Sequence, residues 1–139
     1  MMRALVLYST TGRMALLAKA LGEGLEIAGY DVQLREADTS ASHFSVGQYD
    51  LVCVGSPVVG FFGGSIADDI QQMLRRVSRM EGKSAVAFVR SKLMGTTRSL
   101  RKLMAEMERQ GAMVQDFAAL SKPADAERLG KRLENIARR

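Results

Sequence analysis

The sequence has few of the residues that form disulfides, bind metals or act as catalytic bases: one cysteine, one histidine and no tryptophan in 139 residues. A single cysteine excludes an intramolecular disulfide framework and a cysteine-rich zinc or iron–sulfur site. Cys53 lies between Val52 and Val54 in an apolar run, which favours a buried core thiol over a nucleophile. His43 lies in a polar stretch, and we expect it on a solvent-facing loop.

No stretch of the sequence is apolar for long enough to span a membrane. The most apolar region, residues 51–64, is interrupted by Ser56, Pro57 and several glycines. After Met-Met-Arg, only five apolar residues precede Ser9, too few for a signal peptide. Together with the single cysteine, these features lead us to expect a cytoplasmic protein with no membrane partner.

Positive charge is in excess, with a formal net charge of +5. The basic residues are spread along the chain and interleaved with Asp and Glu at helical spacing, which is typical of solvated helix faces. Only 6% of the residues are aromatic and no nucleic-acid-binding module is recognisable, so we expect no nucleic-acid partner. The charge instead favours an acidic protein partner.

Short apolar runs alternate with segments of helical periodicity along the chain. We expect strands at residues 3–9, 30–37, 49–56, 83–89 and 112–120. We expect helices at residues 12–29, 66–80, 96–111 and 122–139, while residues 38–48 form a connection with at most one helical turn. This alternation predicts one α/β domain over residues 1–139, a doubly wound parallel sheet with helices on both faces.

Two local patterns add detail to these elements. In the strand at 30–37, alternation places Val32 and Leu34 toward the interior and is typical of an edge strand. Ser65 followed by Asp68 matches a capping box at the start of the next helix.

Ligands of doubly wound sheets bind beyond the carboxyl ends of the strands, so functional residues are expected in the loops at 9–14, 56–64 and 90–97. The first loop lacks the Lys-Ser or Lys-Thr of a Walker A loop and the three glycines of a dinucleotide fingerprint. Ser9 and Ser56 stand where a phosphoacceptor receiver domain needs acidic residues. A G-x-S-x-G nucleophile elbow is also absent from the sequence.

The first loop has the composition of a monophosphate site. The hydroxyl groups of Ser9, Thr10 and Thr11 would donate hydrogen bonds to phosphate oxygens. Gly12 lets the backbone approach closely, the helix N-terminus favours an anion, and Arg13 adds positive charge. Ser and Thr before a helix are also ordinary N-caps, so this loop by itself leaves both interpretations open.

The second loop carries Phe61 and Phe62 directly after a buried strand, beside Pro57 and several glycines. Two adjacent exposed rings are costly unless a planar ligand or another apolar surface covers them. A flavin ring and a protein interface are both candidates for that cover, and a third possibility is that one ring folds into the core.

The motifs VLYSTTGRMALLAKAL at residues 6–21 and YDLVCVGSPVVG at 49–60, in this order of elements, resemble the short-chain flavodoxins. The first loop is similar to the S/T-x-T-G-x-T phosphate loop of that family. The resemblance implies a flavodoxin-like five-stranded sheet of order 2-1-3-4-5 and non-covalently bound FMN. It implies that the following residues bind the cofactor: Ser9, Thr10, Thr11, Gly12, Arg13, Met14, Ser56, Pro57, Val58, Val59, Gly60, Phe61, Arg90, Ser91 and Lys92.

Some residues depart from the family pattern. Met14 stands where the family has a second threonine, and Arg13 replaces a small or amide side chain. The third loop is basic, without the acidic and aromatic residues that surround the flavin in the family. If Arg90 or Lys92 lies beside the flavin ring, its positive charge would raise the reduction potential.

The resemblance implies an electron carrier in which FMN performs the redox chemistry and the protein tunes it. Its partner would be a redox protein with an acidic surface, and the chain itself a monomer or a weak dimer. Two alternatives stay open: a flavodoxin-like interaction module without flavin, and an FMN-dependent reductase of quinones or other small substrates.

Overall fold

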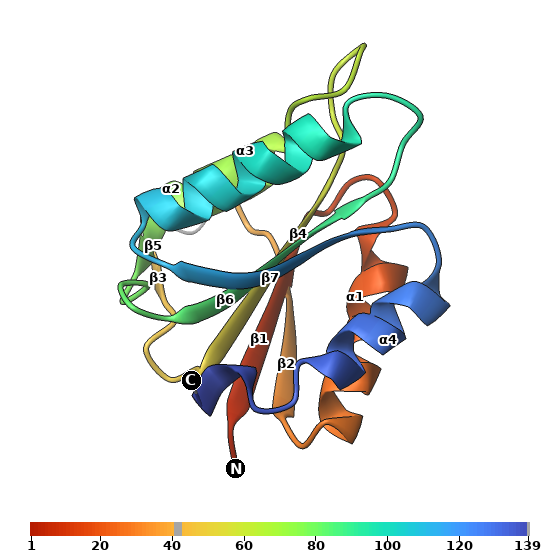
Figure 1. Ribbon diagram of the computed structural model, residues 1–139. Coiled ribbons are helices and arrows are strands. Elements are labelled where there is room, and N and C mark those ends of the chain that lie inside the picture. Colours follow the sequence, from red (N-terminus) through yellow and green to blue (C-terminus); the bar gives the residue numbers. More distant parts are fainter. Residues whose placement is uncertain (41–42, 139) are drawn as a thin grey trace.

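The computed structural model describes residues 1–40 and 43–138 (Figure 1). Its main sheet consists of β1 (Arg3–Tyr8), β2 (Asp31–Glu36), β4 (Leu51–Pro57), β6 (Ser84–Arg90) and β7 (Met113–Leu120). All neighbouring strands are parallel, in the order β2-β1-β4-β6-β7. This arrangement confirms the predicted order 2-1-3-4-5 of five strands.

Helices cover both faces of the sheet, as predicted. On one face lie α1 (Met14–Ile27) and α4 (Pro123–Arg132), and on the other lie α2 (Asp68–Arg76) and α3 (Thr96–Arg109) (Figure 1). Pro123 is in the first turn of α4, where its missing N–H costs no hydrogen bond. In the part of the chain that the structure describes, no helix is long and apolar enough to cross a membrane.

The alternation of side chains along the strands divides the core into two layers. Leu5, Leu7 and Val52 pack toward α2 and α3, whereas Val6 and Cys53 pack toward α1 and α4. All seven residues of β4 are buried. Sheets covered on both faces require such continuous apolar strands, which explains why their composition identified them.

A second, two-stranded parallel sheet pairs β3 (Phe44–Ser45) with β5 (Val77–Ser78). The expected connection at 38–48 therefore contains a short strand where we expected at most a helical turn. The helix expected at 66–80 ends at Arg76, because Val77 and Ser78 form β5 and pair with β3. Phe44 and Val46 bury their side chains in the layer under α2, which fixes this segment. Residues 41–42 of the expected connection and Arg139 of the expected last helix lie outside the described residues.

The predicted capping box is wrong. Asp68 is the first residue of α2 and Ala67 is its N-cap, without a side-chain capping bond. The N–H of Ala67 instead donates to Oγ of Ser56 at 2.8 Å. Ser65 forms an antiparallel bridge with Val59, which holds it outside the helix.

Two further expectations need correction. β2 is an edge strand, as predicted, but Leu34 is still 41% exposed although its side chain lies beside Gly22 of α1. The last helix ends at Arg132, followed by a turn with Asn135 in a left-handed conformation and the 3-10 helix η1 (Ile136–Arg138).

Candidate functional site

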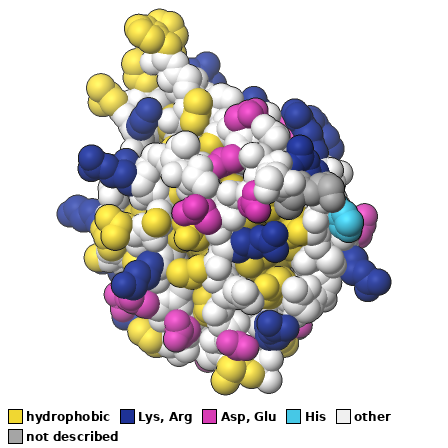
Figure 2. All heavy atoms as spheres, turned by 180° about the vertical axis from the view of Figure 1, so that it is seen from behind, with side chains coloured by type: hydrophobic (Ala, Val, Ile, Leu, Met, Phe, Trp, Pro, Cys, Tyr) yellow, Lys and Arg dark blue, Asp and Glu magenta, His cyan; other side chains and the backbone are white. Residues whose placement is uncertain are grey.

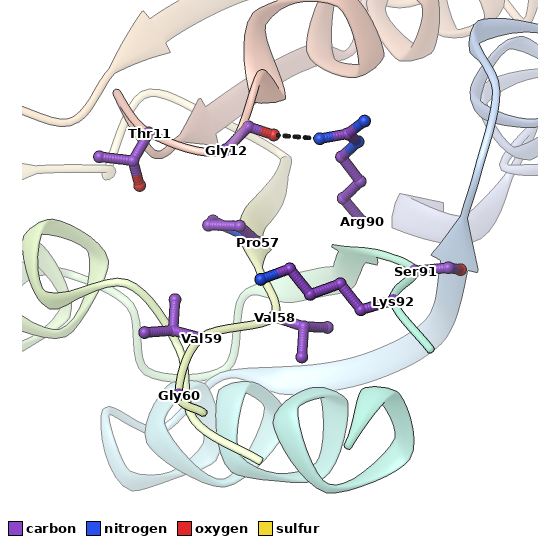
Figure 3. A pocket seen from close by; sticks show the side chains of 9 residues that line it. All are labelled: Thr11, Gly12, Pro57, Val58, Val59, Gly60, Arg90, Ser91 and Lys92. Atoms are coloured by element: carbon purple, nitrogen blue, oxygen red, sulfur yellow. Dashed lines mark hydrogen bonds between the residues drawn. The ribbon is translucent and has the colours of Figure 1, made fainter. Parts of the chain in front are cut away.

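Three loops meet beyond the carboxyl ends of the central strands. We call them loop one (residues 9–13, after β1), loop two (58–67, after β4) and loop three (91–95, after β6). Together with the last residues of β4 and β6, they surround a cavity of about 440 Å³ (Figure 3). Nine residues line it, all of them predicted cofactor-binding residues: Thr11, Gly12, Pro57, Val58, Val59, Gly60, Arg90, Ser91 and Lys92.

Loop one turns into α1 through two successive left-handed residues, Gly12 at φ 67° and Arg13 at φ 57°. This conformation exposes the end of the helix: in the described structure, the backbone N–H groups of Gly12, Arg13 and Met14 donate to no protein acceptor. Free N–H groups at a helix N-terminus favour an anion. The side chain of Met14 is buried beneath α1, so only its N–H is available to a ligand.

A carboxylate from another element accepts hydrogen bonds from the other donors of loop one. Asp69, in the first turn of α2, accepts a hydrogen bond from the Ser9 hydroxyl at 2.8 Å. It also accepts from the N–H of Thr10 at 2.9 Å and from the Thr10 hydroxyl at 2.8 Å. Since the Ser9 proton goes to Asp69, the hydroxyl and the N–H of Thr11 both donate to Ser9 Oγ. All these donors are therefore used within the protein.

Loop two is a closed hairpin that carries two phenylalanine rings. The backbones of Val59 and Ser65 exchange two hydrogen bonds, of 3.0 and 3.1 Å. Phe61 and Phe62, at the tip, contact each other edge to face with ring centroids 4.8 Å apart. Ser56, which precedes this loop, is fully buried, and its hydroxyl donates to the Pro57 carbonyl at 2.9 Å, so it supports the loop from below.

Loops two and three hold each other in place through backbone contact. A Cβ atom built on Gly63 would lie 2.1 Å from the carbonyl oxygen of Met94. The Ser99 hydroxyl, in α3, donates to the Ser65 carbonyl at 2.6 Å and accepts from the N–H of Gly64 at 3.1 Å. The two loops therefore support each other, and the hairpin of loop two projects from the domain at the top of Figure 1.

The end of this projection is apolar. Phe61 and Leu93 are 95% and 100% exposed, and Phe62 and Met94 are more than half exposed. We call these four residues the apolar tip. In Figure 2, apolar side chains gather at the end of the projection, with Lys and Arg side chains below it.

The cavity is positively charged, since its nine lining residues include Arg90 and Lys92 and no acidic side chain. Nη1 of Arg90 donates to the Gly12 carbonyl at 3.2 Å, which joins the end of β6 to loop one (Figure 3). The Lys92 side chain extends toward Pro57 (Figure 3). Cys53, below the site in β4, is fully buried, and burial raises the pKa of its thiol far above the ordinary value, so it is no nucleophile.

Six predicted cofactor-binding residues do not line the cavity. Ser9, Thr10 and Arg13 lie beside it in loop one, Met14 and Ser56 are buried next to it, and Phe61 lies on the apolar tip. The sequence interpretation missed Asp69. Its position in an acidic first turn of a helix suggested capping, and no sequence pattern shows that its carboxylate reaches a loop some 60 residues away.

The strand order and the helices on both faces define a doubly wound α/β protein of the flavodoxin-like class. The chain is similar to a flavodoxin from the domain Archaea, with 21% identity and a TM-score of 0.75 over 99% of this chain and 100% of that one. The two-electron reduced flavodoxin of Megasphaera elsdenii matches at 19% identity and a TM-score of 0.71, over 99% and 100% of the two chains. A flavone reductase matches at 11% identity and a TM-score of 0.78, over 99% and 63%.

Neither a protein-family model nor a curated protein sequence matches the chain. The structural likenesses therefore establish that this protein has the flavodoxin-like fold, and its function must be argued from the site.

The residues of the site fit FMN in two respects and depart from it in one. The cavity has the volume of a small-molecule cofactor site and mixes apolar, backbone and cationic groups. The N–H groups of Gly12, Arg13 and Met14 suit a phosphate. The departure is Asp69, whose carboxylate holds the hydroxyl groups of Ser9 and Thr10.

Proposed function

We propose that this protein is an electron carrier that binds FMN in the cavity between loops one, two and three. The observation that supports this most strongly is the convergence of nine predicted residues on one cavity, at the edge of the sheet where doubly wound proteins bind their ligands. Flavodoxins are among the structures that share the fold. When bound, FMN supplies one- or two-electron redox chemistry.

Each part of the cavity has a role in this proposal. The open N–H groups of loop one and the charge of Arg13 bind the phosphate. Val58, Val59 and Gly60 provide a wall that excludes water from one side of the ring, and their backbone offers carbonyl and N–H groups to its polar edge. Lys92 adds a positive charge that favours the more negatively charged, reduced state of the ligand.

The proposed partner is an acidic redox protein that docks on the apolar tip. The segments 57–67 and 90–102, which carry the four residues of the tip, contain no acidic residue. The second segment carries the following cations: Arg90, Lys92, Arg98, Arg101 and Lys102. An apolar centre within a basic rim complements a surface with an apolar centre and an acidic rim.

A second candidate function is a flavodoxin-like interaction module that binds no flavin. Asp69 favours it, because a protein carboxylate already satisfies donors that a phosphate would use. In that case the apolar tip is the functional surface by itself. Uptake of flavin distinguishes the two functions.

The test is a titration of FMN with the purified protein, followed by quenching of flavin fluorescence. A Val59→Trp variant, which fills the cavity, is expected to weaken binding by about tenfold or more. The control is Leu16→Trp, a similar change on an exposed side chain of α1, which should bind FMN as the wild type does. If Val59→Trp and Leu16→Trp bound FMN equally well, or if the wild type bound no FMN, the proposal that the protein carries FMN in this cavity would be contradicted.

A further inference from the structure

We propose that Asp69 determines the flavin specificity of the cavity. Its carboxylate lowers the affinity for flavins that carry a phosphate group, so that the cavity binds flavins with and without phosphate about equally well. This inference rests on the proposed flavin site. Its basis is that the Asp69 carboxylate takes three of the donors of loop one, from the Ser9 hydroxyl and from the N–H and hydroxyl of Thr10.

The number of donors left to a phosphate is small. The hydroxyl and N–H of Thr11 are directed to Ser9 Oγ, which leaves the backbone N–H groups of Gly12, Arg13 and Met14. A phosphate that used the hydroxyl groups would have to displace the carboxylate first. Its binding therefore gains less than it would in a loop whose hydroxyl groups were free.

Charge acts in the same direction. A phosphate monoester carries a charge between about −1.5 and −2 at neutral pH, and it would lie in the same loop as the Asp69 carboxylate. The like charge of Asp69 thus offsets part of the attraction that Arg13, Arg90 and Lys92 exert on the phosphate. Riboflavin, which has the same ring and no phosphate, escapes this penalty.

Asp69 is firmly held in this position. It lies in the first turn of α2, where a carboxylate is stabilised by the helix dipole, and the next residue, Ile70, is fully buried. The neighbouring Asp68 is exposed and accepts a hydrogen bond from Gln72 instead, at 2.8 Å. Asp68 therefore provides a control with the same charge and the same helix, but without contact to loop one.

The experiment compares FMN and riboflavin by fluorescence quenching in the wild type, Asp69→Asn and Asp68→Asn. The asparagine side chain is similar in shape to that of aspartate and carries no charge, and Asp69→Ser serves as a second uncharged variant if the first does not fold. We expect the wild type to bind the two flavins within about threefold of each other. Asp69→Asn should bind FMN about tenfold or more tightly, with riboflavin and the Asp68→Asn variant unchanged.

An unchanged ratio of FMN to riboflavin affinity in Asp69→Asn would overturn the inference and leave the flavin function standing. If no variant binds any flavin, the proposed function fails, and inorganic phosphate becomes the probe. A rise of Tm with phosphate in Asp69→Asn, absent from the wild type and from Asp68→Asn, would still support the role of Asp69. Absence of that rise would overturn it as well.

Discussion

Gly12 and Pro57 are in direct contact: a Cβ atom built on Gly12 would lie 2.3 Å from the Cβ of Pro57. This contact joins loop one, after β1, to the last residue of β4, and both residues line the cavity. The turn into α1 can pass this close to the proline only because residue 12 has no side chain.

Replacing Gly12 with Ala is therefore expected to lower the free energy of unfolding by about 2–4 kcal/mol, through backbone strain and the clash with Pro57. Gly82→Ala is the matched control. Gly82 has a similar φ of 73°, but a Cβ there would meet nothing within 4 Å, so its loss should be about 1–2 kcal/mol. Urea unfolding measures both, and equal losses would show that the contact with Pro57 is unimportant.

Two glycines of α1 should respond to Ala with opposite signs. A Cβ on Gly24 would lie 2.1 Å from the carbonyl oxygen of Glu127 in α4, so Gly24→Ala must push the helices apart, at a cost of about 1–3 kcal/mol. A Cβ on Gly22 meets the exposed side chain of Leu34 at 3.1 Å, which can move aside, and Cγ1 of Val32 at 3.4 Å, an ordinary contact distance. Gly22→Ala should therefore stabilise the protein by up to about 1 kcal/mol, through helix propensity. Thermal unfolding of both variants checks the signs, and a loss for each would contradict this assignment.

The charge of Lys92 and Arg90 should set the reduction potential of a bound flavin. Replacing both with Met is expected to lower the midpoint potential by roughly 30 mV or more, which is about 1.4 kcal/mol for a two-electron couple. The control is Arg75→Met, an exposed cation in the last turn of α2, at the opposite edge of the sheet from the cavity. Potentiometry of the FMN-loaded proteins measures the shift, and an unchanged potential in the double variant would refute this role.

Cys53 should make stability depend on pH in the alkaline range. Burial among apolar side chains, with a smaller contribution from the charge of Asp116, raises the pKa of the thiol above its ordinary value of 9.0. The folded state thus keeps a proton that the unfolded state loses, and the stability from this residue is complete below pH 9 and declines above it. The expected slope reaches about 1.4 kcal/mol per pH unit.

The measurement for Cys53 is the difference in unfolding free energy between the wild type and Cys53→Ala, a variant that lacks the titrating group. This difference should be constant from pH 6 to 8 and shift against the wild type above pH 9. A constant difference across the whole range would mean that the thiol titrates equally in both states.

The fold could be predicted because its central strands β1, β4 and β6 are mostly apolar and its helices show a regular stripe. β4 is buried over its whole length and is a nearly continuous apolar run, a composition typical of strands covered on both faces. The short pair β3 and β5 could not be predicted, because two-residue strands have no periodicity and depend on the burial of Phe44 and Val46. Leu34 follows the alternation of its strand, but its side chain is 41% exposed at the edge of the sheet.

The candidate site divides in the same way. Residues at the carboxyl end of a strand, such as Pro57 and Arg90, lie where the strand order puts them, so the sequence located them well. Asp69 depends on how α2 is placed against loop one, and Phe61 depends on the shape of the hairpin that carries it outward. Both are tertiary relationships that local sequence patterns do not encode.

The complete burial of β4 bears on how the molecule opens. Its amides lie between β1 and β6 under helices on both faces, so their hydrogens should exchange with solvent only when the whole domain unfolds. The tip of loop two, joined to the end of this strand, is mostly exposed and should exchange through local opening. The part of the cavity formed by β4 should thus open only on global unfolding, whereas loop two should open locally. A ligand could then enter or leave while the rest of the domain stays folded.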